Sequence, residues 1–433
     1  MFPVIKELLF FAIPIIFGQL GQMLLGVGEI LVAGHYATTT QAAIGIAVGL
    51  TAPFFMFGIG LNFVIGPLTS KKKAENNLSR DFFYNAFFIS FLVSLLMALM
   101  LYALAFQLDR FGFVAELIPE AKIYLQLTAL SLIPMICSSA IKEYLQGLED
   151  TFFANASILV VNIFNVVVTY VLMFGKFGFP EMGIKGAAIA MTLSRLFYFF
   201  SLIFYFNVKH TLHFKFKILK DDIKTILAQG LPVSFSVLLE VLFFSSTTIL
   251  CGKMSIIAAA SHNFVLNIVA LTFMIPLAIG SAVSVKVGHE HGLRSKAGII
   301  KYTTAALFIS TIIMCFTAFI YSVFPTFLME IGASDMAVIN YGKKLFIIAA
   351  IFQFPDAIQV TLSGILRALG ITKVPMLINL CSNWFIGLPL GYYLAFNLQY
   401  EALGLWIGLA TGLYLVAISL SLVLKYQLQN YER

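Results

Sequence analysis

The chain has 433 residues, of which 60% are hydrophobic and 11% are charged, with a formal net charge of +7. Its mean hydropathy of +0.96 excludes an ordinary soluble domain, in which about a quarter of the residues are charged. In a membrane protein such a positive balance indicates basic cytoplasmic loops rather than a nucleic-acid partner. The four cysteines lie in apolar segments without metal-ligand spacing, so we expect buried thiols and no metal site.

Twelve apolar segments are long enough to cross a bilayer as helices. Only short connections separate them, which predicts an all-α integral membrane protein with twelve transmembrane helices. The predicted spans are 8–34, 42–69, 82–106, 121–147, 152–175, 184–208, 226–251, 256–285, 301–326, 337–369, 374–397 and 401–425.

The orientation follows from lysine and arginine, which gather in alternate loops. The loops after the second, sixth and eighth spans are basic, whereas HYATTTQ and NLQYE on the opposite side contain no lysine or arginine. Both termini are therefore predicted to be cytoplasmic.

The sequence repeats itself at a nearly constant distance. Pro14 and Pro232 are 218 residues apart, and further along Asn162 and Asn383 are 221 residues apart. Such a register predicts two pseudo-symmetric halves of six spans, an arrangement typical of transporters. The predicted organisation is an N-terminal six-helix lobe, a cytoplasmic linker and a C-terminal six-helix lobe, at 1–208, 209–225 and 226–433.

The first span carries a carboxylate well inside its apolar run. Spacings of three and four residues place Gln22, Gly26 and Glu29 on one face of this helix. An ionisable side chain at membrane depth is costly and usually faces a protein interior or a wet cavity. We interpret Glu29 as a proton or cation site, and Gln22 as a candidate substrate contact.

Two further carboxylates lie within later spans. Glu240 is in the seventh span, and Asp356 is in a polar stripe of the tenth span with Gln353. A carboxyl among apolar groups can exchange protons near neutral pH or bind a monovalent cation. Glu240 and Asp356 are candidates for both coupling and substrate binding, and Gln353 and His262 for substrate binding. A structural role in helix packing remains the alternative, especially for His262.

The fifth span adds Asn162, Asn165 and Thr169 at three-four spacing. Such groups often join membrane helices by hydrogen bonds. The functional alternative is that they coordinate a cation or relay a proton together with Glu29. Arg195, near the middle of the sixth span, has either a packing role or a substrate contact.

Three motifs carry a family resemblance that covers essentially the whole chain. They are GEILVAGHY in the first span, FMIPLAIGSAVSVKVGHEHG in the eighth and FQFPDAIQVTLSGILRALGITKVP in the tenth. With them the chain resembles the multidrug and toxic compound extrusion (MATE) family, and its NorM-like branch in particular. The resemblance implies a V-shaped pair of six-helix lobes and cation-coupled efflux by alternating access.

The resemblance also implies residue roles. Glu29 and Asn165 match the cation site of the N-terminal lobe, and Pro14 matches a proline thought to bend the first helix. Thr169 stands where Asn or Asp is common, and Met191 where Thr is common. Both departures remove oxygen ligands that sodium needs, so a proton is the favoured coupling ion. Glu240 and Asp356 match acidic residues linked to cation and drug binding.

The sequence thus predicts an antiporter that exports cationic or lipophilic organic compounds, with no cofactor beyond the coupling ion and no nucleic-acid partner. We expect it to work as a monomer. The alternative is a flippase of lipid-linked sugar or peptidoglycan precursors from the related superfamily, which would usually have fourteen spans and an arginine-lined cavity. No HExxH or other catalytic constellation is present, which argues against an enzyme.

Overall fold

A computed structural model describes residues 1–210 and 217–431 of the chain. The centre of the predicted linker 209–225 and the basic C-terminal residue Arg433 lie outside the described residues. Within the described ranges all regular secondary structure is helical, as the hydrophobic pattern predicts.

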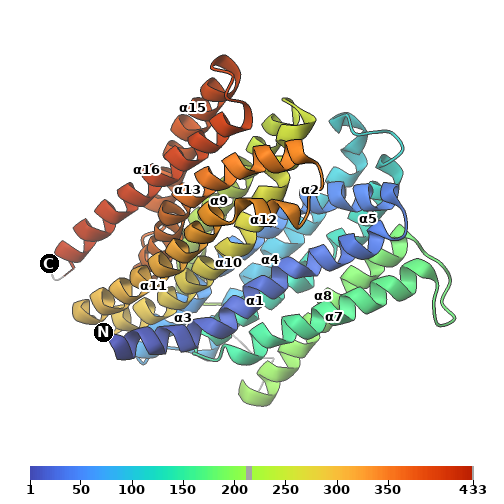
Figure 1. Cartoon of the computed structure of the whole chain (residues 1–433). Helices are drawn as coiled ribbons and strands as arrows, with labels where there is room; N and C mark the ends of the chain where they lie inside the picture. The colour runs from blue at the N-terminus through green and yellow to red at the C-terminus, as the bar shows by residue number, and fades with distance from the viewer. Residues whose placement is uncertain (211–216, 432–433) are drawn as a thin grey trace. The chain divides into compact units, whose positions relative to one another are not determined.

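The helices follow one another with short connections, and Figure 1 colours them along the chain. They are α1 (Phe2–Gly34), α2 (Thr38–Asn62), α3 (Ile65–Ala74), α4 (Arg80–Leu104), η1 (Ala105–Phe111), α5 (Ile118–Ala129), α6 (Leu132–Gly147), α7 (Phe152–Phe174), α8 (Ile184–His210), α9 (Lys220–Gly252), α10 (Ile256–Gly292), α11 (Lys296–Val323), α12 (Pro325–Glu330), α13 (Met336–Ala368), α14 (Lys373–Asn379), η2 (Leu380–Gly387), α15 (Leu388–Tyr392), η3 (Tyr393–Asn397) and α16 (Glu401–Gln429).

The predicted spans are confirmed to within a few residues. In the described ranges eleven helical segments are long and apolar enough to cross a membrane. The fourth predicted span, 121–147, is a helix pair bent by 44° between α5 and α6. Counting that pair as one span gives the twelve that the sequence predicts. The bend falls where Leu130 and Ser131 separate the two helices.

Polar side chains mark several helix starts. Ser79 accepts a hydrogen bond from the backbone N–H of Phe82 at the start of α4, and Ser255 accepts one from Ala258 at the start of α10. These caps satisfy backbone donors that have no partner within the helix. The starts of α4 and α10 are therefore marked by signals that the local sequence supplies.

Contacts divide the chain into two compact units. Unit 2 comprises 17–69 and 76–234, and unit 1 comprises 1–16, 70–75 and 235–433. The first part of α1, up to Ile16, thus belongs with the C-terminal helices, and the first part of α9 with the N-terminal ones. The two lobes inferred from the repeat are a division by sequence, and their bounds stay a prediction.

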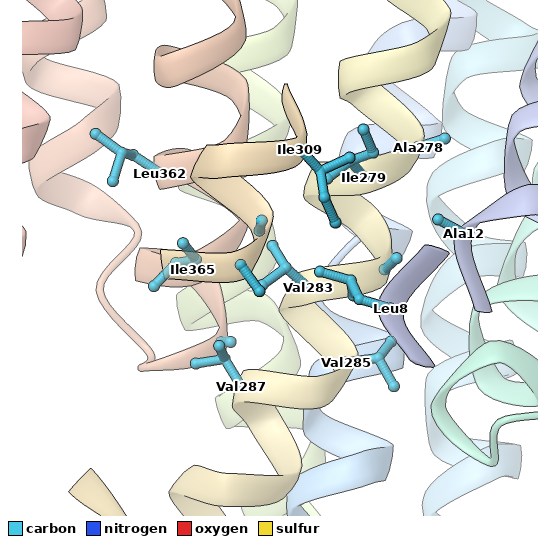
Figure 2. Close-up of a cluster of buried hydrophobic side chains, with 14 of the residues drawn as sticks. Leu8, Ala12, Ala278, Ile279, Val283, Val285, Val287, Ile309, Leu362 and Ile365 are labelled. Carbon is cyan, nitrogen blue, oxygen red and sulfur yellow. The ribbon is translucent and has the colours of Figure 1, made fainter. Parts of the chain in front are cut away.

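Unit 1 is built around α13, which packs against α10, α11 and α16. Figure 2 shows its apolar core, in which Val283 and Val287 of α10 gather with Ile309 of α11 and Ile365 of α13. A Cβ at Gly364 would collide with the backbone oxygen of Gly280, so the close approach of α13 to α10 requires glycine there.

The N-terminal part of α1 is fastened to unit 1 by polar and apolar contacts. Leu8 and Ala12 belong to the same apolar core (Figure 2). Lys286 of α10 forms a 2.8 Å ion pair with Glu7, to which Tyr302 of α11 also donates a hydrogen bond. These contacts explain why the segment groups with distant helices.

The prediction that all four cysteines are buried was wrong for two of them. Cys137 and Cys251 are buried, whereas Cys315 of α11 and Cys381 of η2 are exposed. An apolar span carries apolar residues on every side when one face meets lipid, so apolar neighbours along the chain do not establish burial.

Candidate functional site

In unit 2, close packing of α1 on α7 sets the position of Glu29. Asn162 donates a 2.7 Å hydrogen bond to the backbone oxygen of Gly21. Further along α1, a Cβ at Gly28 would come within 2.7 Å of Val166 Cγ2. The two helices therefore run side by side in the same direction, with Glu29 at the level of the polar residues Asn165 and Thr169.

Glu29 is completely buried. Its Oε2 accepts a 2.7 Å hydrogen bond from the hydroxyl of Tyr124 on α5. Its Oε1 has no hydrogen-bond partner within the described part of the chain. A buried oxygen without a partner is expensive, and it is the group that a bound proton, water or cation would satisfy.

Asn165 and Thr169 of α7, which were predicted to act together with Glu29, also carry buried acceptor oxygens. Asn165 donates its amide N–H to Ser194 of α8 over 3.2 Å, which leaves Asn165 Oδ1 unpartnered among the described residues. Thr169 Oγ1 also has no hydrogen-bond partner among the described residues. Both side chains are fully buried. The predicted coupling residues of this unit thus present three buried acceptor oxygens at one depth of α1 and α7.

Arg195 on α8 brings a positive charge to the same region. Its Nη1 donates a 2.7 Å hydrogen bond to Ser131, and Ser131 donates in turn to the backbone oxygen of Thr128. Thr128 donates to the backbone oxygen of Tyr124, the residue that holds Glu29. The same helix carries Ser194, which accepts the amide hydrogen bond of Asn165. Arg195 therefore belongs to the surroundings of Glu29.

The sequence-based reasoning missed Tyr124, although it is the direct partner of Glu29. Tyr124 lies in the short helix α5, 95 residues from Glu29. No spacing rule connects the two positions. A buried tyrosine usually needs a hydrogen-bond partner, which is the one signal that could have suggested it.

Gln22, predicted as a substrate contact, lines a small pocket closer to the N-terminus of α1. The pocket is formed by Gly18 and Gln22 of α1 with Met135, Ser139 and Lys142 of α6, Asn155 and Ile158 of α7 and Tyr198 of α8. It is a polar hollow within unit 2, separate from the oxygens around Glu29.

In unit 1, Glu240 and Asp356 share one neighbourhood. Gln359 of α13 donates a 3.3 Å hydrogen bond to Glu240 Oε1 on α9. Asp356 lies one turn earlier on α13, is buried, and has an Oδ1 without a partner in the described ranges. Gln359 thus joins Glu240 to the stretch of α13 that carries Asp356. Two nearby carboxyls favour sharing a single proton or a cation.

Gln353 extends this polar stripe along α13. Its Nε2 donates a 3.2 Å hydrogen bond to Thr272, whose hydroxyl lies 2.7 Å from that of Tyr321. Its Oε1 has no partner among the described residues. The structure thus brings Gln353, Asp356 and Gln359 onto one buried face, as their spacing predicts.

The eleventh span flanks this face with irregular helix. η2 and η3 are π-helical, and such stretches often occur at functional sites. Within η2, Trp384 donates a hydrogen bond to the backbone oxygen of Leu239, next to Glu240. Just before it, Asn379 donates to Ser236, one turn from Glu240.

His262, also predicted as a substrate contact, lies fully buried in a hydrogen-bond chain. Trp406 donates to its Nδ1 over 3.0 Å, so the proton of the neutral ring is on Nε2, which lies 2.9 Å from Thr248. Both ring nitrogens are therefore engaged within unit 1. Pro14, the predicted hinge, lies inside the continuous helix α1.

Helices long and apolar enough to cross a membrane, with carboxyls buried in the protein interior, are typical of membrane transporters. The MatE family model matches residues 14–171 and again residues 232–393. The chain belongs to the MatE family, whose members are transporters and not enzymes. The two matches begin 218 residues apart, which confirms the internal repeat.

Two bacterial relatives align over almost their whole length. A probable multidrug resistance protein NorM of Photorhabdus laumondii is 29% identical over 97% of this chain and 95% of its own. The multidrug resistance protein NorM of Photobacterium profundum is 26% identical over 99% of this chain and 96% of its own.

Solved structures confirm the fold. The eukaryotic MATE transporter AtDTX14 superposes with a TM-score of 0.88 at 21% identity, over 99% of this chain and 98% of its own. A mutant of the Vibrio cholerae MATE transporter VcmN superposes with a TM-score of 0.91 at 18% identity, over 100% of this chain and 99% of its own. The predicted MATE-like architecture is therefore confirmed.

Proposed function

We propose that the protein is a multidrug efflux antiporter that exports organic cations in exchange for protons. Membership of the MatE family and the names of the NorM relatives support export of drugs. The coupling assignment is supported by Glu29, Asn165 and Thr169, whose buried side-chain oxygens include some without a partner among the described residues. We place the protein in a bacterial cytoplasmic membrane, as a monomer with both termini in the cytoplasm.

The ligand count favours a proton over sodium. Sodium is a hard cation that needs several oxygen ligands, whereas a proton needs only one basic oxygen. Besides Glu29 itself, Asn165 and Thr169 supply oxygens. Met191, where a threonine is common in the family, offers only a thioether and is buried. Glu29 Oε1 is the proton acceptor in this proposal, and the side chains of Asn165 and Thr169 surround it.

The carboxyls of unit 1 bind the positive end of the substrate. Glu240 and Asp356 provide negative charge, and their amide neighbours on α13 provide hydrogen bonds. Aromatic side chains nearby, including Trp384 and Tyr321, suit flat organic cations through cation–π and dispersion contacts. The exported class is therefore organic cations with apolar bodies.

Antiport requires that proton and substrate favour different conformations or compete for the same carboxyls. Protonation of Glu29 removes a buried negative charge and so changes the balance between the two transporter conformations. Pro14 lacks a backbone N–H and provides a position where α1 bends in response. Release of the substrate outside and of the proton inside then completes one cycle.

Ethidium efflux from proteoliposomes tests the proposal. A pH gradient alone should drive transport, and a sodium gradient alone at equal pH on both sides should not. Transport driven only by sodium would contradict proton coupling. Absence of transport under both gradients, in a preparation that binds ethidium, would contradict the antiporter itself.

A further inference from the structure

We propose that the small hollow lined by Lys142 in unit 2 is a binding site for one small anionic group. The group is either the carboxylate of an amphoteric substrate or a free chloride ion. The inference deepens the proposed function, and it rests on that function where the substrate is the source of the carboxylate. It gives unit 2 a ligand opposite in charge to the one proposed for unit 1.

The hollow is built from helix faces of unit 2. On α6, Met135, Ser139 and Lys142 follow one another at spacings of four and three residues, so they lie on one face of that helix. On α1, Gly18 and Gln22 are four residues apart and line the hollow from another side. The cavity volume is about 10 Å³, which is the space of about one water-sized group. The hollow therefore admits a head group or a single ion and not the body of a drug.

The charged group of the hollow is a lysine. Lys142 is only 7% exposed, and none of the described residues that line the hollow is acidic. Glu143, the next residue of α6, lies about 100° around the helix and does not line it. Lys142 forms no ion pair within the described ranges. A buried ammonium group without a counter-ion is costly, and a bound anion would supply that counter-ion.

Hydroxyl and amide groups supply further donors. Ser139 is 5% exposed, and its hydroxyl has no hydrogen-bond partner among the described residues, so it is available to donate to an anion. The amide of Gln22 can donate as well. The acceptor Asn155 Oδ1 is also unpartnered in that part of the chain, but it packs against Gly18, where a Cβ would collide with it. Donors thus dominate the hollow, which favours an anion over a cation.

Two matched dyes test the substrate as the source of the anion. One is a rhodamine with a free carboxylate, and the other is the methyl ester of the same dye, which lacks the negative charge. Their affinities for the full chain in detergent are measured by fluorescence titration, with a bulky organic sulfonate in place of chloride. In parallel, free chloride is tested by the rise that it causes in the melting temperature at constant ionic strength.

Four variants assign the effects to the hollow. Lys142→Met removes the charge at similar length, and Ser139→Ala removes the unpartnered hydroxyl. Ser138→Ala is the matched control, since Ser138 donates to the backbone oxygen of Pro134 and does not line the hollow. Lys185→Met removes an exposed lysine of α8 as the control for charge.

Losing a hydrogen bond to a charged group should be visible in the dye affinities. In Lys142→Met the ratio of acid to ester affinity should fall about tenfold, and the rise in melting temperature with chloride should disappear. Ser139→Ala should show smaller changes of the same kind, which keeps the test valid if Lys142→Met does not fold. Both controls should match the original protein. A change in the dye ratio alone assigns the anion to the substrate, and a change in the chloride effect alone assigns it to chloride.

The inference is overturned if Lys142→Met and Ser139→Ala keep both the dye ratio and the chloride effect of the original protein, as expected for a hollow that holds only water. Absence of ethidium efflux by the original protein under every gradient would instead contradict the proposed function. The binding measurements do not depend on transport, so the two failures are distinguishable.

Discussion

The hydroxyl of Tyr124 lies 2.7 Å from Oε2 of Glu29 and donates a hydrogen bond to it, while Oε1 of the same carboxyl has no partner in the described ranges. The two carboxyl oxygens therefore have different roles. One fixes the orientation of the carboxyl, and the other is available to a proton. This asymmetry suits a group that must load and release one ion without losing its position.

Tyr124→Phe should disturb coupling without disturbing the fold. A hydrogen bond to a charged group contributes about 1.5–3 kcal/mol, so losing it destabilises ionised Glu29. We expect the pH profile of ethidium efflux to move upward by about one unit, with unchanged expression. Tyr102→Phe, at an exposed tyrosine of α4, is the control. Identical pH profiles for both variants would contradict a role of Tyr124.

Gly28→Leu should destabilise unit 2 because its side chain would collide with Val166 of α7. Gly26→Leu is the matched control, since a Cβ at Gly26 meets no atom within 4 Å. Overpacking of this kind costs about 1–3 kcal/mol. Thermal unfolding in detergent should show a lower melting temperature for Gly28→Leu than for Gly26→Leu. Equal melting temperatures would show that α1 does not pack tightly on α7.

Glu240→Gln and Asp356→Asn test the substrate site of unit 1. Each removes one negative charge, and we expect each to weaken ethidium binding about tenfold. Because Gln359 hydrogen-bonds Glu240 and lies one turn from Asp356, the effects should not add in the double variant. Glu330→Gln, an exposed position on α12, provides the control. Binding is measured by fluorescence titration, and unchanged affinity in the double variant would remove both residues from the site.

Tyr36 and Glu181 form a pH-sensitive contact outside the spans. Tyr36 donates a 2.8 Å hydrogen bond to Glu181, and this bond raises the pKa of Tyr36. The stabilisation is thus fully present below the unfolded pKa of about 10 and is lost as pH rises through the folded pKa. Tyr36→Phe should lower stability near neutral pH by less than about 1 kcal/mol, with the difference from the original protein vanishing at high pH. A pH-independent difference in thermal unfolding would contradict this account.

Much of the fold follows from local sequence properties. Apolar length predicts every span, and the distance between Pro14 and Pro232 predicts the repeat that the double match of the family model confirms. Three-four spacing correctly places Gln353 and Asp356 on one buried face. These features depend on helical periodicity, which a single sequence displays directly.

Other features depend on contacts between distant segments. The pairing of Tyr124 with Glu29 and the attachment of Glu7 to Lys286 join residues that no periodicity relates. The exposure of Cys315 depends on which face of α11 meets lipid, and an apolar helix does not reveal it. Tertiary packing alone decides such relationships.

The most direct test of the central claim measures proton movement during transport by the Glu29→Gln variant. Glutamine keeps the size of the side chain and its hydrogen bonding but cannot titrate. Proteoliposomes with a pH-sensitive dye inside should report substrate-induced proton flux for the original protein and none for Glu29→Gln at any pH between about 5 and 9. Substrate-induced proton flux of equal size in Glu29→Gln would contradict the assignment of Glu29 as the coupling group.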